Sequence, residues 1–384
     1  MGGKKGLRDC KCFMGQRNQV LSVCKGIAII LMVVGHAEAP ELVTNFIYTF
    51  HMPLFFIAAG YFFSEKNLTD PWLFCKKRFK GLYVPFLKWS LIFLLLHNVW
   101  HSFGILNETY GNWTGGVTHP YSWSDAVNRL QLIVFSMSGY DEFMAGAFWF
   151  FRGLLVASIA YLVLHKLLRG KLRLSDVWVT VLIMASVIAF NAFRFANGFT
   201  LKYIPNGGLR ETWGVFFFGA GVLFRRFEYV FARRWFLLIL SFLFILGAGI
   251  LHTCGMNNQG KMIDLLTLPA TGAVGFLMIY WLSGYINQWG GRLLSALSYL
   301  GDNTLYILLW HIPAYKLVSL LKIHYYDLDP LQIGCHMVIH YNNTDFFWVL
   351  YSIVGVAVPI GLIIMWRRLK VSIPRPSRFQ TPVA

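Results

Sequence analysis

Stretches of about 20 consecutive apolar residues recur along nearly the whole chain, and they limit its fold more than any other feature. A helix of that length crosses a hydrocarbon core of roughly 30 Å. Because only 13% of the residues are charged and 57% are hydrophobic, a water-soluble fold would lack the polar groups to cover its surface. The sequence predicts ten membrane spans, at residues 21–38, 43–63, 82–102, 144–166, 176–196, 209–226, 235–254, 262–283, 302–322 and 346–366.

These spans are predicted to be helices, since they are continuously apolar and lack the strict alternation of a membrane β-strand. The expected fold class is an all-α polytopic integral membrane protein. Residues 21–366 would form one transmembrane domain, with no internal repeat. A basic stub (1–20) would precede this domain and a tail (367–384) would follow it.

Basic residues cluster on one side of the predicted membrane. Most of the 34 lysines and arginines precede the first span or follow an even-numbered span. Positive charge collects in cytoplasmic loops, so both termini are predicted to be cytoplasmic. The net charge of +17 therefore indicates topology, with a lipid bilayer as partner and no nucleic acid. The first span lacks a small-residue cleavage site, and we expect it to be retained.

Two long connections, 103–143 and 323–345, are predicted to lie outside. The first is rich in aromatic and amide side chains, which suit sugar rings but equally suit an interfacial aromatic belt. The six cysteines show no metal-ligand spacing. Cys254 and Cys335 are both predicted outside, and a disulfide between them stays open, since the sequence does not give their separation.

The first span carries Lys25 near its inner end and His36 near its outer end. Eleven residues advance a helix by about 16 Å and rotate it by about three turns plus 20°. Lys25 and His36 should therefore share one stripe of the helix. Such a stripe would place a cation beside an anionic donor inside and a proton acceptor outside. A snorkelling lysine and a histidine bonded to a neighbouring helix would give the same pattern.

The second span places His51 in its outer half and Pro53 where helical hydrogen bonding must be disturbed. A tight external link separates His36 from His51, so the two imidazoles are expected to approach each other. Metal binding would need further ligands, and no third one is near them in the sequence. We therefore predict no metal site.

These residues carry a resemblance to a known family. The segments from Lys25 to His36 and from Phe50 to Gly60 resemble the opening of the acyltransferase-3 family of membrane O-acyltransferases, particularly its fucose 4-O-acetylase-like branch. Weaker similarities extend it along the chain, at 76–86, 148–155, 218–221 and 301–311. The resemblance implies about ten core helices and transfer of an acyl group, usually acetyl, from cytoplasmic acyl-CoA to a sugar of a surface glycan.

The resemblance also assigns residues. His36 matches the family's essential histidine and is the predicted catalytic residue. Lys25 stands where the family has an arginine, so the charge is kept but the bidentate fork is lost. Lys77 and Lys80 correspond to two arginines of the family that face the CoA phosphates. Arg78 lies between them and adds a guanidinium that can bind a phosphate through two hydrogen bonds. Ordinary positive-inside charge would explain these last three equally well.

Three further residues lie in predicted spans: Trp149 and Arg152 in the fourth, and His311 near the middle of the ninth. A buried guanidinium is costly, so Arg152 should meet a carboxylate, backbone carbonyls or substrate. We expect Arg152 and His311 to face a central cavity rather than to serve packing alone. Arg152 or His51 would stabilise the oxyanion, and Trp149 and His311 would contact substrate.

The predicted function is a multi-pass O-acetyltransferase of a bacterial plasma membrane. Acyl-CoA would be its donor, a surface glycan or lipid-linked sugar its acceptor, and no cofactor would be permanently bound. Two alternatives remain at this stage: a transporter or flippase of a glycan or lipid precursor, and acyl transfer to a non-sugar acceptor. The matched broken helices and repeated halves common in transporters are not visible in the sequence.

Overall fold

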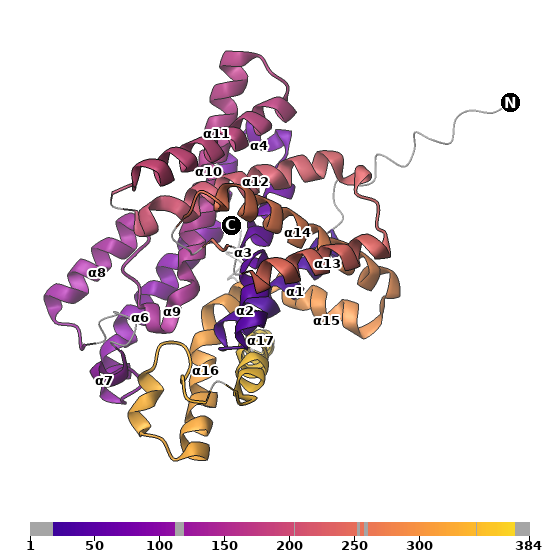
Figure 1. The fold of residues 1–384 in the computed structure, drawn as a ribbon. Coiled ribbons are helices and arrows are strands. Elements are labelled where there is room, and N and C mark those ends of the chain that lie inside the picture. Colours follow the sequence, from indigo (N-terminus) through magenta and orange to yellow (C-terminus); the bar gives the residue numbers. More distant parts are fainter. Residues whose placement is uncertain are drawn as a thin grey trace, which may run out of the picture.

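The chain folds into a helical bundle, known from a computed structural model (Figure 1). The structure describes residues 18–372 apart from 112–118, 203, 252–253, 257–259 and 343, and it contains no strand in that part. Most of the predicted stub and the end of the predicted tail lie outside the described residues. Helices α6, α8, α10 and α11 form one side of the bundle and α13, α14 and α15 the other, with α1, α3 and α12 between them.

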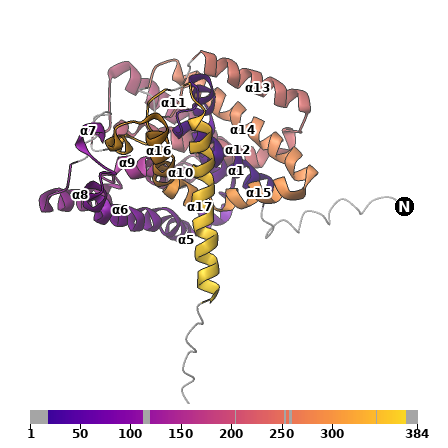
Figure 2. The ribbon, with the colours of Figure 1, turned by 90° about the horizontal axis from the view of Figure 1, so that it is seen from below.

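The helices have the following bounds: α1 Gln19–His36, α2 Glu41–Tyr48, α3 His51–Tyr61, α4 Glu65–Thr69, α5 Pro71–Arg78, α6 Val84–Ser102, α7 Glu108–Gly111, α8 Trp123–Ser136, α9 Glu142–Ala145, α10 Trp149–Leu172, α11 Asp176–Asn197, α12 Leu209–Phe227, α13 Trp235–Ile250, α14 Asp264–Trp289, α15 Gly291–Asp302, α16 Thr304–Tyr326 and α17 Phe347–Ser372. A π-helical turn, Phe79–Tyr83, joins α5 to α6. Figure 2 shows α17 as a long helix whose C-terminal part extends beyond the bundle.

All ten predicted spans coincide with helices, which confirms the all-α polytopic membrane fold. Within the described residues, eight helical segments are long and apolar enough to cross a bilayer. The sixth and seventh predicted spans are not among these eight: α13 has only 16 residues, and α12 carries charged residues in its first and last turns. The helices between the spans, including α8 and α15, were not predicted.

The second predicted span is two helices rather than one. α2 ends at Tyr48 and α3 begins at His51, with Phe50 in a non-helical conformation between them. The break therefore precedes Pro53 instead of lying at it. Pro53 occupies the first turn of α3, where its missing N–H would have no intrahelical partner anyway. The break places His51 at the start of a helix, next to the outer end of α1.

Glycine contacts hold α1 and α3 against their neighbours. A Cβ on Gly26 of α1 would lie 2.1 Å from the backbone oxygen of Leu297 in α15, and a Cβ on Gly221 of α12 would lie 2.0 Å from that of Ile57 in α3. Backbones approach this closely only where side chains are absent, as is common between membrane helices. The two helices that carry Lys25, His36 and His51 are thus fixed by direct backbone packing.

Candidate active site

A cavity of about 310 Å³ runs between α1, α3, α10 and α16. Lys25, Ile29, Met32 and His36 line it along one stripe of α1. The predicted stripe is therefore present, with the lysine at one end of the cavity and the histidine at the other. Much of the remaining lining is apolar, including methionine, phenylalanine and leucine side chains. Such a channel suits an extended, largely apolar arm more than a bulky polar ligand.

His36 pairs with His311 at one end of the cavity. Nδ1 of His36 lies 3.0 Å from Nε2 of His311, and the two rings stack with centroids 5.3 Å apart. His311 is fully buried. His311 therefore contacts the candidate base His36 and does not line the cavity itself. The sequence had predicted a contact with substrate.

The hydrogen-bond partners of His311 determine which of its two ring nitrogens carries the proton. Its Nδ1 faces only backbone oxygens, at 3.0 Å from Ile307 and 3.1 Å from Leu308. In the neutral ring the proton must then sit on Nδ1, because two acceptors cannot bond to a bare nitrogen. Nε2 of His311 consequently accepts from Nδ1–H of His36, and Nε2 of His36 is left unprotonated. The arrangement leaves His36 ready to act as a base.

His51 lines the same cavity, so the predicted approach of the two histidines is present. Its Nδ1 lies 2.9 Å from the backbone oxygen of Ile47, and its ring stacks on Tyr48. The Tyr48 hydroxyl in turn donates to the backbone oxygen of Gly35, at 2.7 Å. Tyr48 thus connects the helix start that bears His51 to the helix end that bears His36.

Trp149 and Arg152 have separate surroundings. Trp149 lines the cavity and lies under the guanidinium of Arg210, 4.2 Å from the ring centroid. Arg152 is 5% exposed and does not line the cavity; its Nε donates to Oε1 of Glu211 at 2.8 Å. Of the partners expected for Arg152, the structure supplies the carboxylate and one backbone carbonyl, that of Met137, 3.5 Å from Nη1. Glu211 was not predicted, although an acid beside a basic residue in a predicted span was a visible signal.

The three predicted donor-binding residues do not line the cavity. Lys77 and Lys80 are exposed. Arg78 is half-buried, with its guanidinium over the rings of Phe74 and Phe218. Gly81 and Leu82, which directly follow these residues, do line the cavity. The basic segment therefore lies beside the Lys25 end of the cavity rather than within it.

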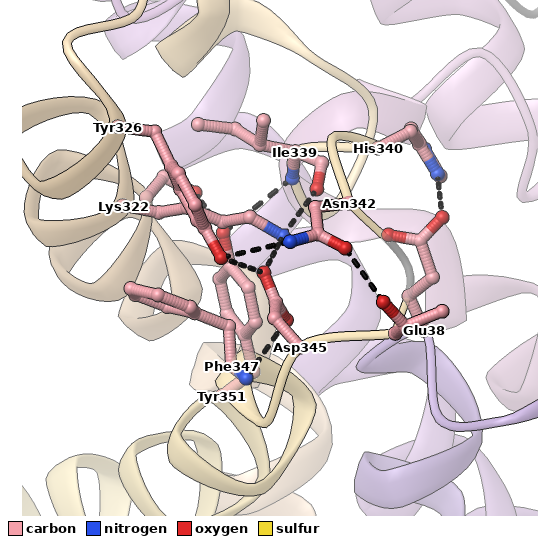
Figure 3. Close-up of polar contacts among 11 residues, drawn as sticks. Glu38, Lys322, Tyr326, Ile339, His340, Asn342, Asp345, Phe347 and Tyr351 are labelled. Carbon is pink, nitrogen blue, oxygen red and sulfur yellow. Dashed lines mark hydrogen bonds and ion pairs between the residues drawn. The ribbon is translucent and has the colours of Figure 1, made fainter.

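We call the segment from residue 327 to residue 346, apart from 343, the outer cap, because the sequence predicts most of it to lie outside. Polar contacts join this segment to α16 (Figure 3). Two buried lysines of α16 bond to it, and neither was predicted. Nζ of Lys316 donates to the backbone oxygens of Ile333 and Cys335, at 2.8 and 2.7 Å. Nζ of Lys322 lies 3.0 Å from Oδ2 of Asp345.

The outer cap also contacts the segment that follows α1. His340 pairs with Glu38, which follows His36 by two residues (Figure 3). His336 belongs to the same cap, and burial, reinforced by Lys316 and His340, lowers its pKa to about 4. His336 is therefore neutral at physiological pH. Cys335 and Cys254 are both free thiols, so the disulfide left open by the sequence is not formed.

The fold and the cavity define a polytopic membrane protein with a histidine pair at one end of an apolar channel. Among the described residues, no three histidine, cysteine or acidic side chains converge as metal ligands. A family model described as an acyltransferase domain matches residues 18–366. The chain belongs to this acyltransferase-3 family and is a membrane acyltransferase. No curated protein and no solved structure matches it.

Proposed function

We propose that this protein transfers an acyl group, acetyl in the first instance, from cytoplasmic acyl-CoA to a hydroxyl group of an extracytoplasmic carbohydrate. The observation that carries the proposal is the cavity that joins Lys25 to the His36–His311 pair along one stripe of α1. A thioester on an extended pantetheine arm would reach the histidines from the opposite end of such a channel. Family membership supports acyl transfer in general.

His36 is the proposed general base. Its unprotonated Nε2 would remove the proton of the acceptor hydroxyl while the hydroxyl oxygen attacks the thioester carbonyl. The carbon–sulfur bond then breaks, an ester forms, and the CoA thiolate leaves and takes up the proton from His36. A positioned base contributes about 10²–10⁴-fold to such a step. His311 holds His36 in the tautomer that this step requires.

The oxyanion of the tetrahedral intermediate needs a donor. Arg152 bonds Glu211 outside the cavity, so His51 is the better candidate of the two residues named from the sequence. Nδ1–H of His51 points at the backbone oxygen of Ile47. His51 would donate from Nε2 only as an imidazolium, and in its neutral form it would instead orient the acceptor hydroxyl.

The donor phosphates are proposed to lie at the entrance formed by Lys77, Arg78 and Lys80, with Lys25 further inside. Trp149 lines the cavity wall, where its ring would contact a sugar beside the guanidinium of Arg210. The carbohydrate acceptor and a bacterial plasma membrane location follow from the resemblance to the fucose 4-O-acetylase-like branch. Acyl-CoA is a substrate here, and no permanently bound cofactor is proposed.

Incubating membranes that contain the protein with labelled acetyl-CoA tests the proposal. Mass spectrometry of surface glycans with and without the gene then identifies the acceptor. Acetyl ester on a glycan hydroxyl, absent without the gene, is expected. Label on lipid or peptide alone would contradict the carbohydrate acceptor, and no label on any product would contradict the acyltransfer itself.

A further inference from the structure

A second cavity of about 1230 Å³ lies between the segment after α3 and the helices α10, α11 and α12. It is separate from the channel described above, but the two are neighbours. Phe62 lines the channel and Phe63, the next residue, lines the second cavity. All the connections around it belong to the side predicted to be cytoplasmic.

The side chains that line the second cavity carry a net positive charge. Four basic side chains, Lys66, Arg169, Arg225 and Arg226, line it together with two acids, Glu65 and Asp176. Arg169 and Asp176 pair with each other, with Nη1 of Arg169 3.2 Å from Oδ1 of Asp176, so neither counts toward the balance. The remaining positive charge would attract an anion into the cavity.

Two further features provide directed donors. His165 lines the cavity and is 1% exposed; its Nε2 lies 3.8 Å from Oδ1 of Asp176, while its Nδ1 has no hydrogen-bond partner. A buried polar nitrogen without a partner is costly unless a ligand completes it. Ser175, the N-cap of α11, also lines the cavity, and its side chain caps no backbone N–H. The N-terminus of a 22-residue helix is therefore directed at the same space, as in many phosphate sites.

We propose that this second cavity binds a phosphate group. The oxygens of a phosphate would form ion pairs with Lys66 and Arg226. They would also accept hydrogen bonds from the backbone N–H groups in the first turn of α11 and from Nδ1 of His165. Two sources carry that chemistry at the cytoplasmic surface: the nucleotide end of coenzyme A and the headgroup of an anionic phospholipid. If the nucleotide end binds here, the phosphates of coenzyme A lie in this cavity instead of at the entrance formed by Lys77, Arg78 and Lys80, which do not line it.

The test uses the full chain in phosphatidylcholine nanodiscs. A Lys66→Glu, Arg226→Glu double variant reverses two charges of the lining. Lys171→Glu is the matched control, because this exposed lysine in the last turn of α10 does not line the cavity. Equilibrium dialysis with labelled coenzyme A gives affinity, and adding phosphatidylglycerol to the discs gives the change in thermal unfolding midpoint. Neither readout needs turnover, so a failure of acyl transfer would leave the result interpretable.

If the nucleotide is the ligand, the double variant should bind coenzyme A at least about tenfold more weakly, as expected for lost charge-assisted hydrogen bonds, and the control within about twofold of wild type. If the headgroup is the ligand, coenzyme A affinity should stay unchanged, while phosphatidylglycerol raises the midpoint of wild type and control but not of the double variant. Equal behaviour of the double variant and the control in both assays would overturn the proposal. Should the double variant not fold, Arg226→Gln alone is measured against Lys171→Gln by the same criteria.

Discussion

Replacing His311 tests whether its hydrogen bond with His36 keeps Nε2 of His36 unprotonated. His311→Phe keeps a flat ring in the fully buried site but removes the acceptor for Nδ1–H of His36, which lies 3.0 Å away. A hydrogen bond of this kind contributes about 0.5–1.5 kcal/mol net, which corresponds to about two- to tenfold in rate. The loss should fall on kcat for acetyl transfer, while KM for acetyl-CoA stays unchanged, because the donor phosphates bind elsewhere.

The assay is labelled acetyl transfer at saturating acetyl-CoA, with insertion of each variant checked by its amount in the membrane. His311→Gln offers a side-chain oxygen as acceptor and should recover part of the loss. In the His36→Ala background, His311→Phe should have no further effect, since the two residues act as a unit. The role given to His311 is refuted if the losses in kcat from His36→Ala and His311→Phe multiply in the double variant. It is equally refuted if His311→Phe alone leaves kcat at the wild-type level.

Three further predictions concern residues that do not line the first cavity. Breaking the buried Arg152–Glu211 pair with Glu211→Leu should destabilise the fold by about 3–5 kcal/mol, whereas Arg152→Met with Glu211→Leu should cost much less in thermal unfolding. His336 has a pKa lowered from 6.5 to about 4, so its stabilising contribution is present above pH 6.5 and lost as pH falls toward 4. Hydrogen exchange in the outer cap should accordingly rise over that window, less so in His336→Gln. Lys77→Glu with Lys80→Glu should raise KM for acetyl-CoA, measured by initial rates.

Each of these has a result that would contradict it. Equal destabilisation by the single and double changes at Arg152 and Glu211 would mean that the ion pair is not what Glu211→Leu disturbs. Exchange in the outer cap that is independent of pH between 6.5 and 4 would remove His336 as the cause. An unchanged KM in the lysine variant would take Lys77 and Lys80 out of the donor site.

Much of the fold could be predicted because it depends on local sequence. Span length and apolarity located ten helices, and helical geometry placed Lys25 and His36 on one stripe. A disturbance of helical hydrogen bonding at Pro53 was predicted, but the break between α2 and α3 precedes this proline. A proline in a first helical turn costs little, so its presence marked a helix start and not an interruption.

Contacts between distant residues could not be predicted in this way. His36 and His311 are 275 residues apart, and no periodicity relates them. Arg152 was expected to meet a carboxylate, but only the packing of α10 against α12 selects Glu211. Lys316 and Lys322 bond backbone oxygens of the outer cap, and a loop's path is not encoded in a hydropathy pattern. The polar partners of buried charges thus required the tertiary structure.

The central claim is that His36, at the far end of a channel open to a cytoplasmic donor, promotes acyl transfer to an outside acceptor. Sealed membrane vesicles test it most directly, with labelled acetyl-CoA supplied only at the cytoplasmic face and acetyl ester measured on glycans at the opposite face. Wild-type protein should label these glycans, and His36→Ala, inserted in equal amount, should lower the rate by about 10²–10⁴-fold. Undiminished labelling by His36→Ala would contradict the account.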